Sequence, residues 1–206
     1  MDSKLLFGGE EFTPLICGEE SFGSGGDHVR EKDGLWAVLF WLSILAHYNQ
    51  EGSQLVHVED IVVRHWKQFG RNFYCRYDYE GVDSGSANKV MTHIRNQLAT
   101  LPGTSLEAGY VVKTADEFTY VDPVDHSVSR NQGLRILFTD NSRIVFRLSG
   151  TAGSGATIRV YLEKYESRPE QLLQPTAAAL QDLVRIALAV SQIKELTGFE
   201  HPTVIT

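Results

Sequence analysis

The sequence predicts an α+β protein, with helices near both ends and the clearest strands between them. Apolar residues recur at helical spacing in the first third of the chain, whereas apolar residues recur at every second position in three segments of the second half. The 206 residues, 42% of them hydrophobic and 22% charged, suffice for one large domain or two modest ones.

The first predicted helix is strongly apolar. Asp33 and Gly34 lead into residues 35–45, whose apolar side chains cover most of the helix circumference. The apolar run 35–46 is shorter than the roughly 20 residues that cross a bilayer. We therefore expect a buried helix, packed between two layers of a globular protein.

A second helix is predicted near residues 58–69, after a break at 49–53 (NQEGS). Gly70 stands where a left-handed cap would end this helix. We expect the domain boundary in the stretch 70–79, which divides the chain into domains over residues 1–70 and 71–206.

The second half combines strands and helices. Residues 134–138 and 144–148 alternate apolar and polar side chains around a turn at Asp140 and Asn141, and 157–163 alternate in the same way. Two helices complete the pattern, one near 88–101 closed by Pro102 and Gly103, and one near 176–197 capped by Gly198.

The polar loop Cys17–Gly23 (CGEESFG) is rich in hydrogen-bond acceptors. Glu19, Glu20 and Ser21 suit sugar hydroxyls and are poorly suited to an anion. The loop therefore predicts a polyol site.

A second polar loop, Arg147–Arg159 (RLSGTAGSGATIR), has the opposite character. Its glycines allow backbone N–H groups to converge on an anion, its hydroxyls add neutral donors, and its two guanidiniums can grip phosphate oxygens bidentately. Donors and glycines alternate along it: Arg147, Ser149, Gly150, Thr151, Gly153, Ser154, Gly155, Thr157 and Arg159. A phosphosugar would satisfy both loops.

The glycine-rich loop admits two other interpretations. Residues 150–157 (GTAGSGAT) match a nucleotide-binding P-loop except that Ala156 replaces the lysine, and a strand follows where a P-loop opens a helix. That interpretation is rejected. A plain hairpin turn flanked by solvated arginines stays open on composition alone.

Charge and cysteine usage restrict the partners. The formal net charge of −7 argues against general binding to nucleic acids or anionic membranes, so the arginines form a local positive site suited to small anions. Cys17 and Cys75 are far apart and no signal peptide precedes them, which predicts no disulfide framework and a reducing cytoplasmic location.

Several separated motifs carry a family resemblance. They are CGEESFG, Asp27-His28, REKDG at 30–34, SRNQGLR, RLSG with ATIR, and the closing PTVIT. Together they resemble the phosphoglucomutases of the α-phosphohexomutase superfamily over essentially the whole chain. The resemblance implies a four-domain enzyme that interconverts glucose 1-phosphate and glucose 6-phosphate through glucose 1,6-bisphosphate. Residues 1–70 would be the end of its α/β domain 3, and 71–206 its domain 4, an antiparallel sheet with flanking helices similar to TATA-binding protein.

The resemblance also assigns roles to residues. Glu19, Ser21 and Lys32 would bind the substrate, with Lys32 near the transferring phosphoryl group, where it would assist proton transfer. The phosphate that is not transferred would be held by Arg147, Ser149, Gly150, Thr151 and Arg159. Ala152 stands where relatives more often keep glycine, which puts only the backbone path of the loop in doubt.

Two motifs of the family do not occur in these residues, namely the catalytic serine in a motif like TASHNPGG and the metal site in one like DGDGDR. Acidic pairs such as Asp122 and Asp125 lack the clustering that Mg²⁺ needs, so no metal site is predicted here, and the ion would bind in the missing amino-terminal domains. His28 is a ligand contact or, more often in such loops, a structural hydrogen bonder. We expect the chain alone to be inactive.

Other function classes remain open. The family includes a non-catalytic paralogue that acts at cell junctions and has a degraded phosphate loop; the intact Arg147 and Arg159 favour the enzyme. A related hexose-phosphate mutase or bisphosphate synthase is a further alternative. In each enzymatic case the partners are small hexose phosphates.

Overall fold

The computed structural model describes residues 16–19, 22–29, 31–50, 54–123, 125–150 and 155–206. The chain forms two compact units, Met1–Gln68 with Asp122–His126, and Phe69–Val121 with Ser127–Thr206. None of the helices in the described ranges has both the length and the apolar composition needed to span a membrane.

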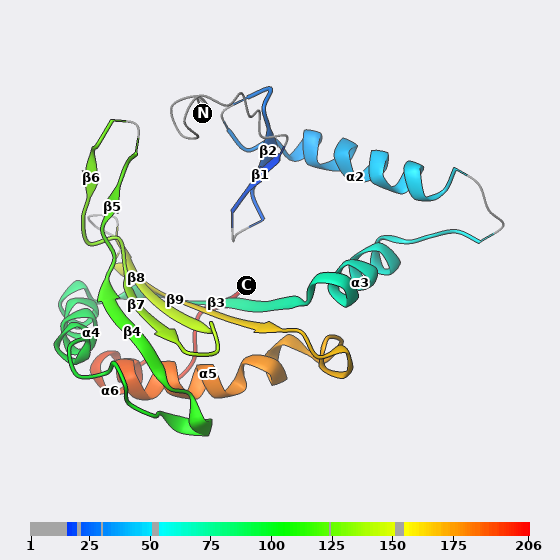
Figure 1. The fold of residues 1–206 in the computed structure, drawn as a ribbon. Helices are drawn as coiled ribbons and strands as arrows, with labels where there is room; N and C mark the ends of the chain where they lie inside the picture. Colours follow the sequence, from blue (N-terminus) through cyan, green and yellow to red (C-terminus); the bar gives the residue numbers. More distant parts are fainter. Residues whose placement is uncertain (1–15, 20–21, 30, 51–53, 124, 151–154) are drawn as a thin grey trace. The chain divides into compact units, whose positions relative to one another are not determined.

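The first unit contains a short hairpin and two helices (Figure 1). Strands β1 (Ile16–Gly18) and β2 (Ser24–Gly26) pair antiparallel, with Cys17 opposite Gly25. Helix α2 spans Gly34–Tyr48 and helix α3 spans Val58–Phe69, as the sequence predicts. The left-handed cap predicted at Gly70 is confirmed by its φ of 82°.

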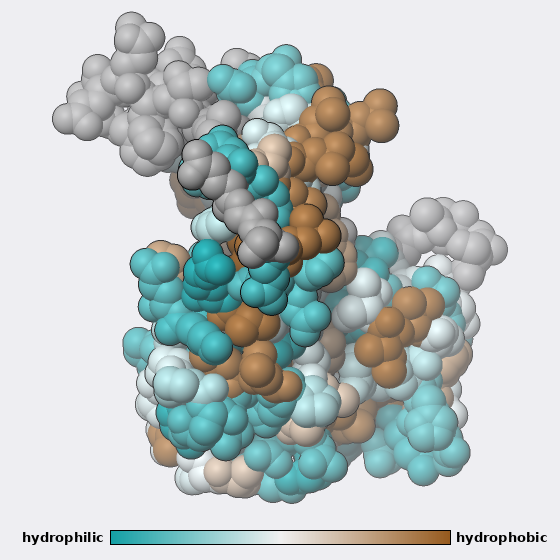
Figure 2. Space-filling view, turned by 90° about the vertical axis from the view of Figure 1, so that its right-hand side faces the viewer, coloured by the Kyte–Doolittle hydropathy of each residue, from teal (hydrophilic) through white to brown (hydrophobic). Residues whose placement is uncertain are grey.

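Helix α2 is less buried than its sequence suggests. None of its residues is buried, and the side chain of Leu39 is 66% exposed. Hydrophobic residues reach the molecular surface as brown areas in Figure 2. The prediction of a helix packed between layers is therefore wrong for this chain. Burying an apolar helix on all sides needs a layer on each face, and the described residues of this unit provide only two three-residue strands besides α3.

The second unit is built on a six-stranded antiparallel sheet with the strand order β10-β3-β9-β8-β7-β4 (Figure 1). The strands are β3 (Arg71–Val82), β4 (Val112–Glu117), β7 (Leu134–Phe138), β8 (Arg143–Gly150), β9 (Ala156–Glu166) and β10 (Val204–Ile205). A two-stranded ribbon of β5 (Tyr120–Val121) and β6 (Val128–Ser129) precedes β7. The predicted turn between β7 and β8 is confirmed, with Asn141 at a φ of 69°.

Helices cover one face of this sheet: α4 (Ser84–Gln97), α5 (Thr176–Ser191) and α6 (Ile193–Thr197) (Figure 1). The predicted class, α+β with an antiparallel sheet and flanking helices, is confirmed. Two boundaries differ. Helix α4 starts earlier than expected because the side chain of Asp83 caps it by accepting from the Ser86 amide at 2.9 Å. The single final helix is wrong, since Gln192 at a φ of 50° separates α5 from α6.

The core lies between these helices and the sheet. Ile144 and Phe146 of β8 and Ile158 and Val160 of β9 are at most 2% exposed and pack in one cluster with residues of α4 and α5. Because side chains alternate between the two faces of a strand, the odd-numbered residues of β8 and β9 face away from this core. The sheet thus has one apolar face and one polar face.

Candidate functional site

The polar face of strands β8 and β9 brings predicted site residues together. Arg147 lies directly opposite Arg159, and the next outward-facing pair is Ser149 opposite Thr157. Directly opposed residues in an antiparallel pair have Cβ atoms about 4.5–5.5 Å apart. Arg147 and Arg159, called here the arginine pair, therefore occupy adjacent positions at the end of the hairpin that carries the glycine-rich loop.

Arg159 has a second neighbour across the sheet, on β3. Asp78 is its direct partner in the β3–β9 register and is only 3% exposed, although it lies on the polar face. Oδ1 of Asp78 accepts a hydrogen bond of 2.9 Å from Nε of Arg76 and lies 3.9 Å from Nε of Arg159. Among the described residues, Nε of Arg159 is buried and has no hydrogen-bond partner.

The arginine pair differs from other arginines of the same face. Arg135 donates two hydrogen bonds of 2.7 Å to Asp116, and Arg143 forms an ion pair with Glu163. Within the described residues, Arg147 has no carboxylate at ion-pair distance, and Nε of Arg159 approaches Asp78 only to 3.9 Å, without a hydrogen bond. Like charges placed directly opposite each other destabilise a sheet, and a buried N–H without an acceptor costs about 1–3 kcal/mol. An anion with several oxygens, bound between the two guanidiniums, would relieve the first of these costs.

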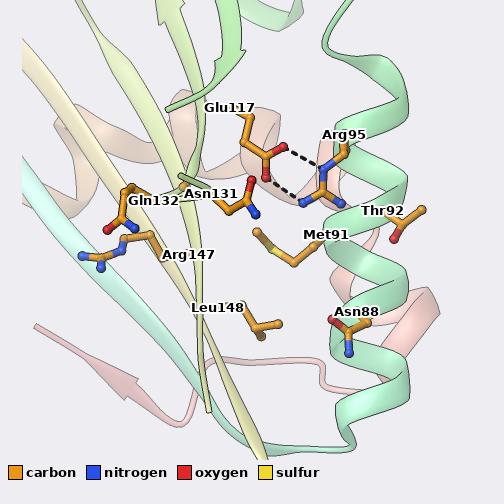
Figure 3. A pocket seen from close by; sticks show the side chains of 10 residues that line it. Asn88, Met91, Thr92, Arg95, Glu117, Asn131, Gln132, Arg147 and Leu148 are labelled. Atoms are coloured by element: carbon orange, nitrogen blue, oxygen red, sulfur yellow. Dashed lines mark hydrogen bonds and ion pairs between the residues drawn. The ribbon is translucent and has the colours of Figure 1, made fainter. Parts of the chain in front are cut away.

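A pocket of about 360 Å³ opens beside Arg147 (Figure 3). In this view Arg147 lies next to Gln132, whereas Asn131 lies on the side of the Arg95–Glu117 ion pair. Gly133 makes room for the stem of Arg147: a Cβ atom there would lie 3.1 Å from its Cγ, and the φ of 151° also favours glycine. The turn before β7 therefore shapes one wall of the site.

The second group of predicted residues surrounds the β1–β2 hairpin. Nζ of Lys32 lies 2.5 Å from Oε1 of Glu19, and both side chains are exposed. They line a pocket of about 250 Å³ together with Cys17, Gly18, Gly23, Ser24, Gly25 and Glu31. An ammonium and a carboxylate at one small pocket can serve both a negatively charged group and hydroxyls of a ligand.

Glycines are essential to the shape of this hairpin. A Cβ atom on Gly23 would lie 2.3 Å from Oε1 of Glu19 and 2.7 Å from Cδ of Lys32, so the ion pair passes where a side chain would be. On Gly25 it would lie 2.6 Å from the backbone carbonyl oxygen of Glu31. The loop composition therefore reflects close packing around the Glu19–Lys32 pair.

The start of α2 fixes the far side of this hairpin. Asp33 accepts a hydrogen bond of 2.9 Å from the Trp36 amide as helix cap, and its own amide donates to the Ser24 carbonyl at 2.9 Å. Nε2 of His28 lies 3.0 Å from Oδ2 of Asp33, and this hydrogen bond lowers the pKa of Asp33. His28 thus has the structural role that was one of its two predicted alternatives.

Some predicted residues lie outside the described part of the chain, namely Ser21 with Glu20, and Thr151. Gly150 ends β8 opposite Ala156. The described residues include no group of three His, Cys, Asp or Glu side chains that could hold a metal ion.

Sequence reasoning missed Asp78, Gly133 and Gly23. Gly133 carried a signal, because it belongs to the SRNQGLR motif, whereas nothing in the sequence connects Asp78 to an arginine 81 positions later.

Comparison with known proteins assigns both parts of the chain. Residues 71–203 match the family model for the C-terminal domain of phosphoglucomutase-1, and residues 1–61 match the model for the alpha/beta/alpha domain III of phosphoglucomutase/phosphomannomutase.

Curated relatives and a crystal structure agree with these matches. Phosphoglucomutase-1 of Paramecium tetraurelia is 53% identical over 93% of this chain, and the chloroplastic phosphoglucomutase of Arabidopsis thaliana and the cytoplasmic one of Pisum sativum are each 52% identical. The crystal structure of the open form of Paramecium parafusin, a phosphoglucomutase, superposes with a TM-score of 0.82 at 53% identity over 93% of this chain. The chain spans about a third of the length of these proteins, 31–34%.

Proposed function

Because this chain belongs to the phosphoglucomutase family, we propose that it provides the sugar- and phosphate-recognition parts of an enzyme that interconverts glucose 1-phosphate and glucose 6-phosphate through glucose 1,6-bisphosphate. The observation that carries this proposal is the placement of Arg147 directly opposite Arg159 on the polar face of the sheet. We further propose that residues 1–70 are the end of domain 3 and that 71–206 are domain 4.

The arginine pair would hold the phosphate that is not transferred. Each guanidinium offers a planar fork of N–H donors to phosphate oxygens, and the hydroxyl of Ser149 adds a neutral donor beside Arg147. Thr151 and the backbone of Gly150 would complete the cradle. Binding energy obtained at this remote phosphate holds the sugar so that its reacting oxygen is correctly placed, which raises the rate of the chemical step.

The hairpin loop of the first unit would bind the sugar. A carboxylate accepts hydrogen bonds from hydroxyl groups, so Glu19, with Ser21, would contact the sugar ring. Lys32 would face the transferring phosphoryl group and assist proton transfer. A bisphosphate intermediate must turn end for end to complete the reaction. The arginine pair can therefore bind either of its phosphates, while the loop accepts the ring in both orientations.

The phosphoryl carrier and the metal site would come from other parts of such an enzyme. Transfer needs a nucleophile that becomes phosphorylated, and the serine motif of the family does not occur in these 206 residues. Mg²⁺ is the family's metal, but the described residues do not fit it, and we assign no step to it here. The chain alone would then recognise substrate without converting it.

The alternative functions differ in how well they agree with the arginine pair. A non-catalytic paralogue with a degraded phosphate loop agrees poorly with the arginine pair, and a related hexose-phosphate mutase would use the same residues for another sugar. A cytoplasmic location remains a proposal, since relatives named as cytoplasmic and as chloroplastic are equally similar.

Titration of this chain with inorganic phosphate and with glucose 1,6-bisphosphate, followed by calorimetry, tests the proposal. Arg147→Lys and Arg159→Lys keep the charge but remove the fork, and each should weaken binding at least about tenfold, or 1.4 kcal/mol. Arg143→Lys is the matched control, because Arg143 lies on the same face but pairs with Glu163. Wild-type affinity in both site variants would show that the arginines are solvated strand residues only.

A further inference from the structure

Asp78 is the buried charged residue nearest to the arginine pair, and the recognition chemistry proposed above does not use it. It is 3% exposed on a sheet face where its neighbours on β9 are partly exposed. Burial of a carboxylate is costly unless the group is paired. Its burial therefore indicates that Asp78 has a specific interaction with a positively charged neighbour.

The contacts of Asp78 show what it holds. Oδ1 accepts from Nε of Arg76 at 2.9 Å and is the nearest carboxylate oxygen to Nε of Arg159, at 3.9 Å. The strand β10 closes the other side, because the amide and hydroxyl of Thr203 both donate to the backbone carbonyl of Asp78 at 2.8 Å. Backbone pairing thus fixes the position of Asp78 on both edges of β3.

The geometry at Arg159 is directional. A guanidinium has one edge that includes Nε, and its terminal amino groups lie further from the backbone. Asp78 lies on the Nε side of Arg159, whose side chain is 37% exposed although Nε itself is buried. A buried negative charge on that side attracts the Nε edge of the guanidinium, and this leaves the terminal amino groups of Arg159 available to an anion.

We propose that Asp78 is a positioning residue that orients Arg159 for binding the phosphate of a hexose phosphate. This inference rests on the proposed phosphate site and goes beyond it, because Asp78 acts through Arg159 without touching the ligand. A carboxylate beside an anion site also repels the anion. The two effects have opposite signs, and this makes the role testable.

Phosphate titration of Asp78→Asn separates the two effects. Loss of orientation should weaken the binding of inorganic phosphate about tenfold, whereas loss of a merely repelling charge should strengthen it. Asp78→Glu keeps the charge but displaces the carboxylate by one methylene. A positioning role therefore again predicts weaker phosphate binding, whereas a simple charge effect predicts an unchanged affinity. Using both variants keeps the test decisive if one of them does not fold.

Asp116→Asn is the matched control, because it breaks an Asp–Arg pair on the same face and should leave phosphate affinity within about twofold of wild type. In an Arg159→Lys background, Asp78→Asn should cause no further loss. An equal loss in that background, or unchanged or tighter binding in the single variants, would overturn the proposal.

A ligand-free measurement tests the positioning itself. In the unliganded chain, the ¹⁵N heteronuclear NOE of Arg159 Nε should fall in Asp78→Asn and stay unchanged in Asp116→Asn. A high NOE in both variants would overturn the proposal whatever the phosphate data show. If wild type binds no phosphate but this NOE falls, the proposed function fails while the orientation of Arg159 by Asp78 stands.

Discussion

The arginine pair and the β1–β2 hairpin are built by different means. The arginines lie on long paired strands above a core whose central side chains are fully buried, so the sheet register determines where they point. Glu19 directly follows the three-residue strand β1 and Lys32 lies in the segment between β2 and α2, and glycines that leave room for them determine their position. The position of the arginine pair thus depends on the sheet and the core beneath it, whereas the position of the Glu19–Lys32 pair depends on local packing in the hairpin.

Removing core volume beneath the arginine pair should have the largest effect. Phe146→Ala empties a fully buried position next to Arg147 and should lower the free energy of unfolding by about 3–5 kcal/mol. The control Leu39→Ala, on the exposed surface of α2, should change it by no more than about 0.5 kcal/mol. Urea unfolding followed by circular dichroism measures both. A similar loss in both variants would mean that α2 is buried in solution.

The second-largest effect is expected at low pH, which should destabilise the two units to different extents. The Arg168 guanidinium lowers the pKa of the buried Glu166 from 4.5 to about 2. Because the folded-state pKa is the lower one, this stabilisation is present above pH 4.5 and is lost as the pH falls toward 2. Glu166→Gln should therefore cost about 2–3 kcal/mol at pH 7, with the difference from wild type vanishing near pH 2.

The matched change in the first unit is Asp33→Asn. The pKa of Asp33 is also lowered, by the hydrogen bond from His28, but a third of this side chain is exposed, and water screens its interactions more than those of the buried Glu166. Thermal melts between pH 2 and pH 7 should show a weaker pH dependence of the loss than in Glu166→Gln. An equally steep dependence would contradict the contrast between the units.

The smallest stability effects are expected at the hairpin glycines. Gly25→Ala forces a Cβ atom against a backbone carbonyl and should cost about 1–2 kcal/mol, because that oxygen cannot move aside easily. Gly23→Ala meets only the ends of the Glu19 and Lys32 side chains and should cost less than about 0.5 kcal/mol while separating them. Thermal melts give the stability difference, and titration with glucose 1-phosphate reports the separation of the pair. The reverse order of stability would refute this account of the loop.

The sequence predicted the second unit better than the first. Period-two alternation placed Arg147 and Arg159 on one polar face, because side-chain direction in a strand is a local property. Their register, and the neighbour Asp78, depend on which strands pair, and alternation does not encode that. Gly133 is understood only from the structure, since it reflects the path of Arg147 across a neighbouring strand.

Predictions failed where a local pattern needed tertiary context. The apolar residues of α2 indicated burial, but burial also requires a partner layer, which the described residues do not supply. The helical pattern of 176–197 continues through Gln192, whose left-handed conformation is not marked by a glycine. The resemblance assigned both Glu19 and Lys32 to the substrate site, whereas their contact across Gly23 is a matter of three-dimensional packing.

Two guanidiniums held directly opposite each other link the stability of the second unit to the anions in its surroundings. Any solute that binds the folded arginine pair and not the unfolded chain stabilises the fold by mass action, by about 2.7 kcal/mol at a concentration 100 times its Kd. Salt that only screens charge also relieves part of the repulsion, with a different dependence on concentration. Buffer composition is therefore a thermodynamic variable for this protein, and a melting temperature has meaning only together with the anion present.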